Sequence, residues 1–107
     1  MGNHLNPDNQ IAIFKGKSIR KTIYQKEWWF SVIDILQILL DQPDDLKARK
    51  YWNKLAQRLR EEGSEVVTNC HHLKLLAPDG KMRETDCANT EIMFRIIQSI
   101  PSALRPK

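Results

Sequence analysis

Two cysteines and two neighbouring histidines are the residues whose chemistry first suggests a site. Cys70, His71 and His72 are consecutive, and Cys87 lies beyond the turn signal Pro78-Asp79-Gly80. If the chain folds back at this turn, His72 comes roughly opposite Cys87, and three zinc ligands could meet. No C-x-x-C spacing and no evident fourth ligand accompany them. We therefore favour two free, buried thiols over zinc, and we predict no metal and no cofactor.

The sequence offers little that is typical of catalysis. Cys70 and His71 could serve as nucleophile and base, but adjacent residues on a strand point to opposite faces. There is no G-x-S-x-G, no H-E-x-x-H and no phosphate-binding glycine loop, because the four glycines are spread singly along the chain. We therefore predict that the protein is not an enzyme.

Positive charge between Leu46 and Gly63 is the strongest chemical signal. The segment reads LKARKYWNKLAQRLREEG, with six basic residues and no acid from 47 to 60. Apolar residues recur at helical spacing and predict a buried stripe: Ala48, Tyr51, Trp52, Leu55 and Leu59. The remaining face carries the candidate nucleic-acid contacts: Lys47, Arg49, Lys50, Asn53, Lys54, Gln57, Arg58 and Arg60. The cations suit phosphates, and the two amides could reach base edges.

The distribution of charge supports a local cationic face. The chain has 107 residues and a formal net charge of +4, and acids match or outnumber bases on both sides of the basic segment. This length suits one domain with one modest core. The polar start MGNHLNPDNQ is unlike a signal peptide, and no apolar run is long enough to span a membrane. We expect a cytoplasmic protein with no membrane partner.

The first half of the chain predicts a β-meander followed by two helices. Short β-favouring runs cover 11–14, 19–24 and 28–30. Ser31 is a suitable N-cap for an almost wholly apolar helix, with Asp34 completing a shortened capping box. The basic helix then covers 46–62, with Asp44 or Asp45 as its cap and Gly63 as its terminator. Residues 65–68 could form another short strand.

The second half predicts a β-hairpin and a third helix. Strands over 72–77 and 81–87 flank the Pro-Asp-Gly turn. The hairpin could act as a wing whose phosphate contacts are Lys74, Lys81 and Arg83, or as an ordinary solvated face, because acids are interspersed. Asn89 caps the last helix, which buries Met93, Ile96, Ile97 and Ile100.

Two adjacent tryptophans, Trp28 and Trp29, have two interpretations. Exposed rings could stack on bases. Alternate residues of a strand face opposite ways, however, so at least one ring should pack in the core.

Together these elements predict an α+β fold, in which a small antiparallel meander and a hairpin pack with three main helices. The two helices after the meander could form a winged-helix-like pair. Residues 1–10 are expected to be a polar flexible tail, 11–102 the folded domain, and 103–107 an unstructured end.

Three segments carry a resemblance to a known family. They are EWWFSVIDILQIL at 27–39, KYWNKLAQRLREEGSE at 50–65 and TDCANTEIMFRIIQSIPS at 85–102. The chain resembles the Bro-N domain of phage antirepressors and baculovirus Bro proteins, and is especially similar to prophage members related to the DNA-damage-inducible protein D group. The resemblance implies a compact DNA-binding domain in prophage or viral gene regulation. Similar chains usually continue after the Ile-Pro-Ser, whereas this one ends in ALRPK.

Three hypotheses for function remain open from the sequence. The leading one is a DNA-binding regulatory module of a prophage antirepressor-type protein, which contacts the phosphates of duplex DNA through helix 46–62. The alternative is a protein-interaction module that binds a phage repressor without contacting DNA. The third is a folded prophage remnant whose basic residues are only a solvated face. Any of these is compatible with a homodimer.

Overall fold

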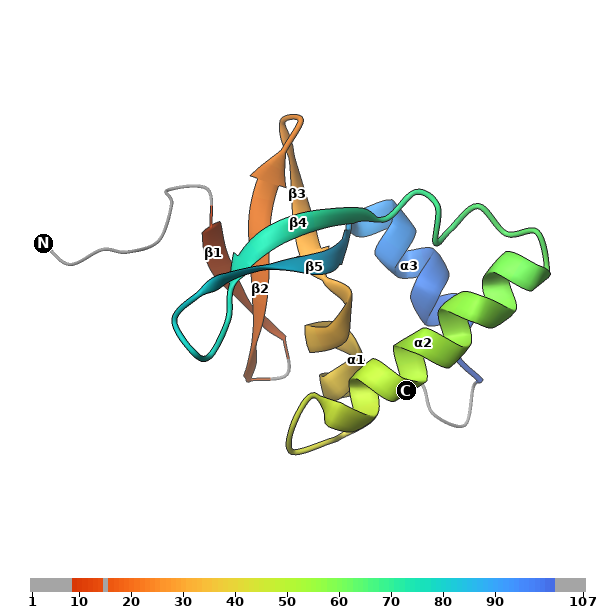
Figure 1. Ribbon diagram of the computed structural model, residues 1–107, viewed down its shortest axis with the longest axis horizontal. Helices are drawn as coiled ribbons and strands as arrows, with labels where there is room; N and C mark the ends of the chain where they lie inside the picture. Colours follow the sequence, from red (N-terminus) through yellow and green to blue (C-terminus); the bar gives the residue numbers. More distant parts are fainter. Residues whose placement is uncertain (1–8, 15, 102–107) are drawn as a thin grey trace, which may run out of the picture.

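The computed structural model describes residues 9–14 and 16–101 and confirms the predicted α+β class. Within this part, five strands form one antiparallel sheet in the order β1-β2-β3-β5-β4 (Figure 1). The strands are β1 (Asn9–Phe14), β2 (Lys17–Tyr24), β3 (Glu27–Ser31), β4 (His71–Leu76) and β5 (Met82–Ala88). The helices are α1 (Val32–Leu39), α2 (Leu46–Glu61) and α3 (Thr90–Gln98).

The meander and the hairpin, which the sequence predicts as separate units, are joined in this one sheet. Strand β3 pairs with β5 through Phe30 opposite Ala88 and Ser31 opposite Cys87. Both α1 and α2 are therefore inserted between two neighbouring strands. The sheet also curls, so that β4 crosses β2 (Figure 1). The Arg20 guanidinium on β2 donates to the carbonyl oxygen of Leu76 on β4 at 3.1 Å, which holds the crossing together.

The strand ends lie one or two residues from their predicted positions, and the predictions for the N-terminal tail and for the segment after α2 need correction. Strand β1 begins at Asn9, so the last two residues of the predicted tail belong to the sheet. Residues 1–8 of that tail, and the predicted C-terminal end 103–107, lie outside the described residues. The prediction of a short strand over 65–68 is wrong. These residues form turns, in which the amides of Asn69 and Cys70 donate to earlier carbonyls, and Val66 and Val67 enter the core from the turn.

Helix α1 begins at its predicted cap but uses Asp34 differently. The Ser31 hydroxyl accepts from the Asp34 amide at 3.2 Å, as an N-cap does. The Asp34 carboxylate does not complete a capping box. It accepts from the backbone amide, Nε and Nη2 of Arg20 at 2.8, 2.9 and 2.9 Å. This partly buried ion pair ties β2 to α1, and the hydrogen bond with Asp34 raises the pKa of Arg20, which stays cationic.

The apolar stripe of α2 is confirmed. Its buried residues are Ala48, Trp52, Leu55, Ala56 and Leu59, while the predicted Tyr51 is only half-buried. Gly63 follows the C-cap Glu62 and terminates the helix as predicted, with a φ of +78°. The amides of Gly63 and Ser64 donate to the carbonyls of Arg60 and Leu59, which is a Schellman motif. Glycine suits this position because a left-handed conformation is strained for residues with a Cβ.

The remaining core comes from α3 and the aromatic strand. Asn89 caps α3 by accepting from the Ile92 amide at 2.9 Å, as expected. Trp29 is buried and its indole N–H donates to the Tyr24 carbonyl at 3.0 Å, so the prediction that one tryptophan of the pair packs in the core is confirmed. Trp28 is half-buried beneath the Lys21 ammonium, which lies 4.0 Å from its ring centroid. In the described part of the chain, no helix combines the length and apolarity needed to cross a membrane.

Candidate nucleic-acid interface

The cysteine and histidine residues do not assemble into a metal site. The turn closes where the Ala77 amide donates to the Lys81 carbonyl, and this register places His71 opposite Cys87. The predicted pairing of His72 with Cys87 is therefore wrong by one residue, because His72 faces Asp86 and its Nδ1 lies 2.8 Å from that carboxylate. Over residues 9–14 and 16–101, no group of three histidine, cysteine or acidic residues could hold a metal ion.

Both cysteines are free, as predicted, but only Cys87 is fully buried, whereas Cys70 is half-buried. Both are poor nucleophiles. Burial raises the pKa of the Cys70 thiol to about 12, and the negative charge of Asp86 adds to the shift. Burial likewise raises the pKa of Cys87 to about 12. The Cys70 Sγ donates weakly to the Val66 carbonyl at 3.5 Å. Each sulfur is therefore a protonated thiol at neutral pH, and the thiolate needed for attack is scarce.

These thiols predict a loss of stability in alkaline solution. Above pH 9 the unfolded chain releases the protons of Cys70 and Cys87, whereas the folded chain keeps them up to about pH 12. The unfolded state then binds fewer protons, so stability falls as the pH rises. We expect the free energy of unfolding to drop by about 3 kcal/mol between pH 8 and pH 10, about 1.4 kcal/mol for each thiol. Urea titrations under reducing conditions would measure it.

The matched control replaces both cysteines with alanine. This variant is expected to be less stable than the native chain at pH 8, but its stability should change much less between pH 8 and pH 10. If the native chain and the variant lose stability equally over this interval, the thiols are not the cause.

All eight predicted contact residues of α2 are exposed, but its six cations are not equivalent. Arg49 Nε lies 2.7 Å from the Asp45 carboxylate. Arg58 lies 3.7 Å from Glu62 and also donates to the Ser99 carbonyl at 2.9 Å. Across residues 16–101, the other four cations of α2 form no ion pair, and these are Lys47, Lys50, Lys54 and Arg60. These four are the ones available to an external anion.

Three of these cations form a line, which we name the lysine row: Lys47, Lys50 and Lys54. Their spacing of three and then four residues places them on one face of α2. The row rises along the helix by roughly 10 Å, at 1.5 Å per residue. Phosphates follow each other at about 3.4 Å of axial rise along one DNA strand, so the row is comparable in length to three nucleotide steps.

The two amides lie beside the lysine row. Gln57 Nε2 donates to the Glu61 carboxylate at 3.2 Å on the outer face of the helix. Asn53 borders a small cleft of about 240 Å³ between α2 and β5, together with Trp52 and Thr85. The spacing of four residues between Asn53 and Gln57 makes them neighbours on the helix surface. Gln57 continues the row one turn beyond Lys54, and Asn53 flanks it.

The structure brings only part of the predicted wing to the basic helix. Arg83 and Arg49 border the same cleft of about 500 Å³, but this cleft also carries the acids Asp44, Asp45 and Glu84. Arg83 forms an ion pair with Asp79. Lys74 and Lys81 are exposed, and Lys74 stands opposite Glu84. The hairpin turn and the C-terminal end of α2 lie on opposite sides of the molecule (Figure 1).

Helix α2 is attached to the rest of the domain by polar contacts as well as by its apolar stripe. The Trp52 indole N–H donates to the Asp86 carboxylate on β5 at 2.6 Å. Near the other end of the helix, Arg58 donates to Ser99 at the C-cap of α3. The lysine row is therefore carried on a fixed backbone, and binding through it requires ordering only of the lysine side chains.

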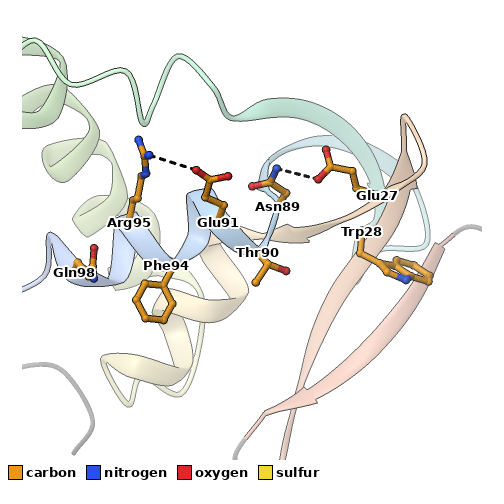
Figure 2. A pocket seen from close by; sticks show the side chains of 8 residues that line it. All are labelled: Glu27, Trp28, Asn89, Thr90, Glu91, Phe94, Arg95 and Gln98. Atoms are coloured by element: carbon orange, nitrogen blue, oxygen red, sulfur yellow. Dashed lines mark hydrogen bonds and ion pairs between the residues drawn. The ribbon is translucent and has the colours of Figure 1, made fainter.

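One surface feature escaped the sequence reasoning. A hollow of about 690 Å³ lies between the start of β3 and α3, bordered by Trp28, Thr90, Phe94 and Gln98 (Figure 2). Phe94 is 62% exposed. The sequence could have predicted this exposure, because the helical spacing that buries Met93 and Ile96 turns Phe94 outward.

Comparisons of the chain with protein-family models, with curated proteins and with solved structures found no match. Function is therefore inferred from the geometry and charge of the residues described above, and the resemblance to the Bro-N domain remains an expectation from the sequence.

Proposed function

We propose that this chain is a DNA-binding regulatory module that holds duplex DNA through the lysine row of α2. The observation that carries the proposal is the set of four exposed cations on one helix that have no acidic partner in residues 16–101: Lys47, Lys50, Lys54 and Arg60. Cations already paired within a protein gain little from a phosphate, whereas unpaired ones release counterions from DNA when they bind. The resemblance to Bro-N domains supports a regulatory role of the prophage antirepressor type.

The same geometry favours phosphate contact over base reading as the main source of affinity. Lysines bind phosphate as point charges and carry little sequence information. Any preference for sequence would come from Asn53 and Gln57, since amides can pair with adenine in the major groove. Gln57 must first give up its hydrogen bond to Glu61. We therefore expect binding to most duplex sequences, with modest discrimination among them.

A salt titration tests the proposal. Binding of the native chain to random duplex DNA, single-stranded DNA and RNA would be measured by fluorescence anisotropy across a range of salt concentrations. Four phosphate contacts predict a slope of log K against log salt of about −3.6 for duplex DNA, and a shallower slope of about −2.8 for single strands.

Two results would contradict the proposal. One is the absence of duplex binding at low salt, and the other is an affinity that does not change with salt. A complex with a phage repressor that survives nuclease treatment, in a chain that does not bind DNA, would support the protein-interaction alternative instead.

A further inference from the structure

The hollow beside α3 has the properties of an interaction surface. Among residues 16–101, Phe94 is the most exposed large apolar side chain, and it lies at the edge of the hollow opposite Trp28 (Figure 2). The helix packs on the core through other residues, Ile92, Met93 and Ile96. Phe94 thus contributes little to the fold of its own chain, and an exposed aromatic ring next to an open hollow is typical of a binding site.

The charges around Phe94 indicate what kind of partner fits. Glu91 and Arg95 lie one turn apart on α3, 3.3 Å from each other, and are 74% and 57% exposed. Figure 2 shows both on one side of the helix, whereas Phe94 points to the other side and Trp28 lies beyond Thr90. The surface therefore has a charged rim, with the acid before the base along the chain, and an apolar rim.

This arrangement is complementary to itself. A two-fold axis perpendicular to α3 would place a second α3 antiparallel to the first. The charged rim of one copy would then lie beside the charged rim of the other, and the two apolar rims would also lie side by side. The reversal of direction brings Glu91 opposite Arg95 of the second copy, and Arg95 opposite its Glu91. The same operation moves Phe94 of the second copy toward the hollow between Phe94 and Trp28. Antiparallel helices also align their dipoles favourably.

We propose that this surface binds a second copy of the same chain, and that α3 forms a symmetric homodimer with Phe94 of each copy in the hollow of the other. Symmetric dimers use one patch on both subunits, and this patch meets that requirement. Its core is one helix of nine residues and the start of one strand, which is small beside the roughly 800 Å² per partner of a standard interface. Self-association is accordingly weak, with a dissociation constant in the micromolar range.

Sedimentation equilibrium over a wide range of protein concentrations tests the inference. The native chain should convert from monomer to dimer within this range. Phe94→Ser should weaken the dimer by at least about 100-fold, since each dimer loses two rings and each loss is worth about tenfold. The matched control is Leu46→Ser, which removes a 57% exposed apolar side chain from α2 and should leave the dimer unchanged.

A charge exchange separates the proposed pairing from a general effect on the helix. Glu91→Arg alone should weaken the dimer about tenfold, because a cation then faces a cation in each of the two symmetric pairs. The double variant with Glu91→Arg and Arg95→Glu should restore it. A native chain that stays monomeric throughout, a Phe94 variant that behaves like the Leu46 control, or a double variant no better than the single one would overturn the inference.

This inference does not rest on the proposed function, because the lysine row and the α3 surface share no residue. Loss of the dimer with DNA binding retained, or the reverse, distinguishes failure of one proposal from failure of the other.

Discussion

A chain in which Lys47, Lys50 and Lys54 are all changed to glutamine is expected to bind duplex DNA about 100-fold more weakly than the native chain at 0.15 M salt. Each phosphate contact contributes about 0.9 to the salt slope, which at this concentration corresponds to about 0.7 logarithmic units of affinity. Three contacts therefore account for about two logarithmic units. The salt slope itself should fall by about 2.7. Fluorescence anisotropy with one duplex at several salt concentrations gives both quantities.

The matched control removes the same charge from another part of the surface. Changing Lys17, Lys21 and Lys26 to glutamine also lowers the net charge by three, but these residues lie on β2 and the turn that follows it. We expect this control to lose less than about threefold in affinity, mainly through the weaker long-range field. Equal losses in the two variants would show that net charge, rather than the lysine row, determines binding.

The largest effect on stability is expected from Asp34→Ala. The carboxylate of Asp34 accepts from the backbone amide, Nε and Nη2 of Arg20, and the two side chains are only 14% and 24% exposed. Its removal leaves a partly buried guanidinium without a counter-ion. We expect a loss of about 3 kcal/mol in the free energy of unfolding and a melting temperature lower by roughly 15 °C. Urea denaturation and thermal melts would measure these changes.

Two further variants test whether the unpaired guanidinium of Arg20 causes this loss of stability. Glu91→Ala removes an exposed ion pair of the same type, and should cost less than about 0.5 kcal/mol. Replacing both members of the buried pair, by Arg20→Met and Asp34→Leu, should cost less than Asp34→Ala alone, because no unpaired charge is left behind. A double variant that is clearly less stable than the single one would contradict this account.

Local patterns predicted much of this molecule. The stripe of α2 follows from residue spacing, because one side of a helix in a small domain must be buried. The caps Ser31 and Asn89, and the terminating Gly63, follow from backbone chemistry that operates within a few residues. The hairpin follows from its Pro-Asp-Gly turn. None of these needs information about distant parts of the chain.

Long-range contacts account for what was missed. Asp34 resembles a capping-box residue locally, but Arg20 competes for it from another element. The sequence of neither strand predicts that β3 pairs with β5. The sequence could, however, have predicted which cations of α2 form ion pairs. Asp45 and Arg49 are four residues apart, as are Arg58 and Glu62, and this spacing favours ion pairs on a helix.

The insertion of both α1 and α2 between neighbouring strands has a consequence for folding. The first three strands pair with their neighbours in the sequence, and such local contacts close quickly. Joining Ser31 to Cys87 instead requires closure of a long loop, which is entropically costly. The hydrogen bond from Trp52 to Asp86 forms only when this loop has closed. The polar contact that fixes α2 to the sheet thus forms late, and a nascent chain that has not yet supplied β5 lacks it.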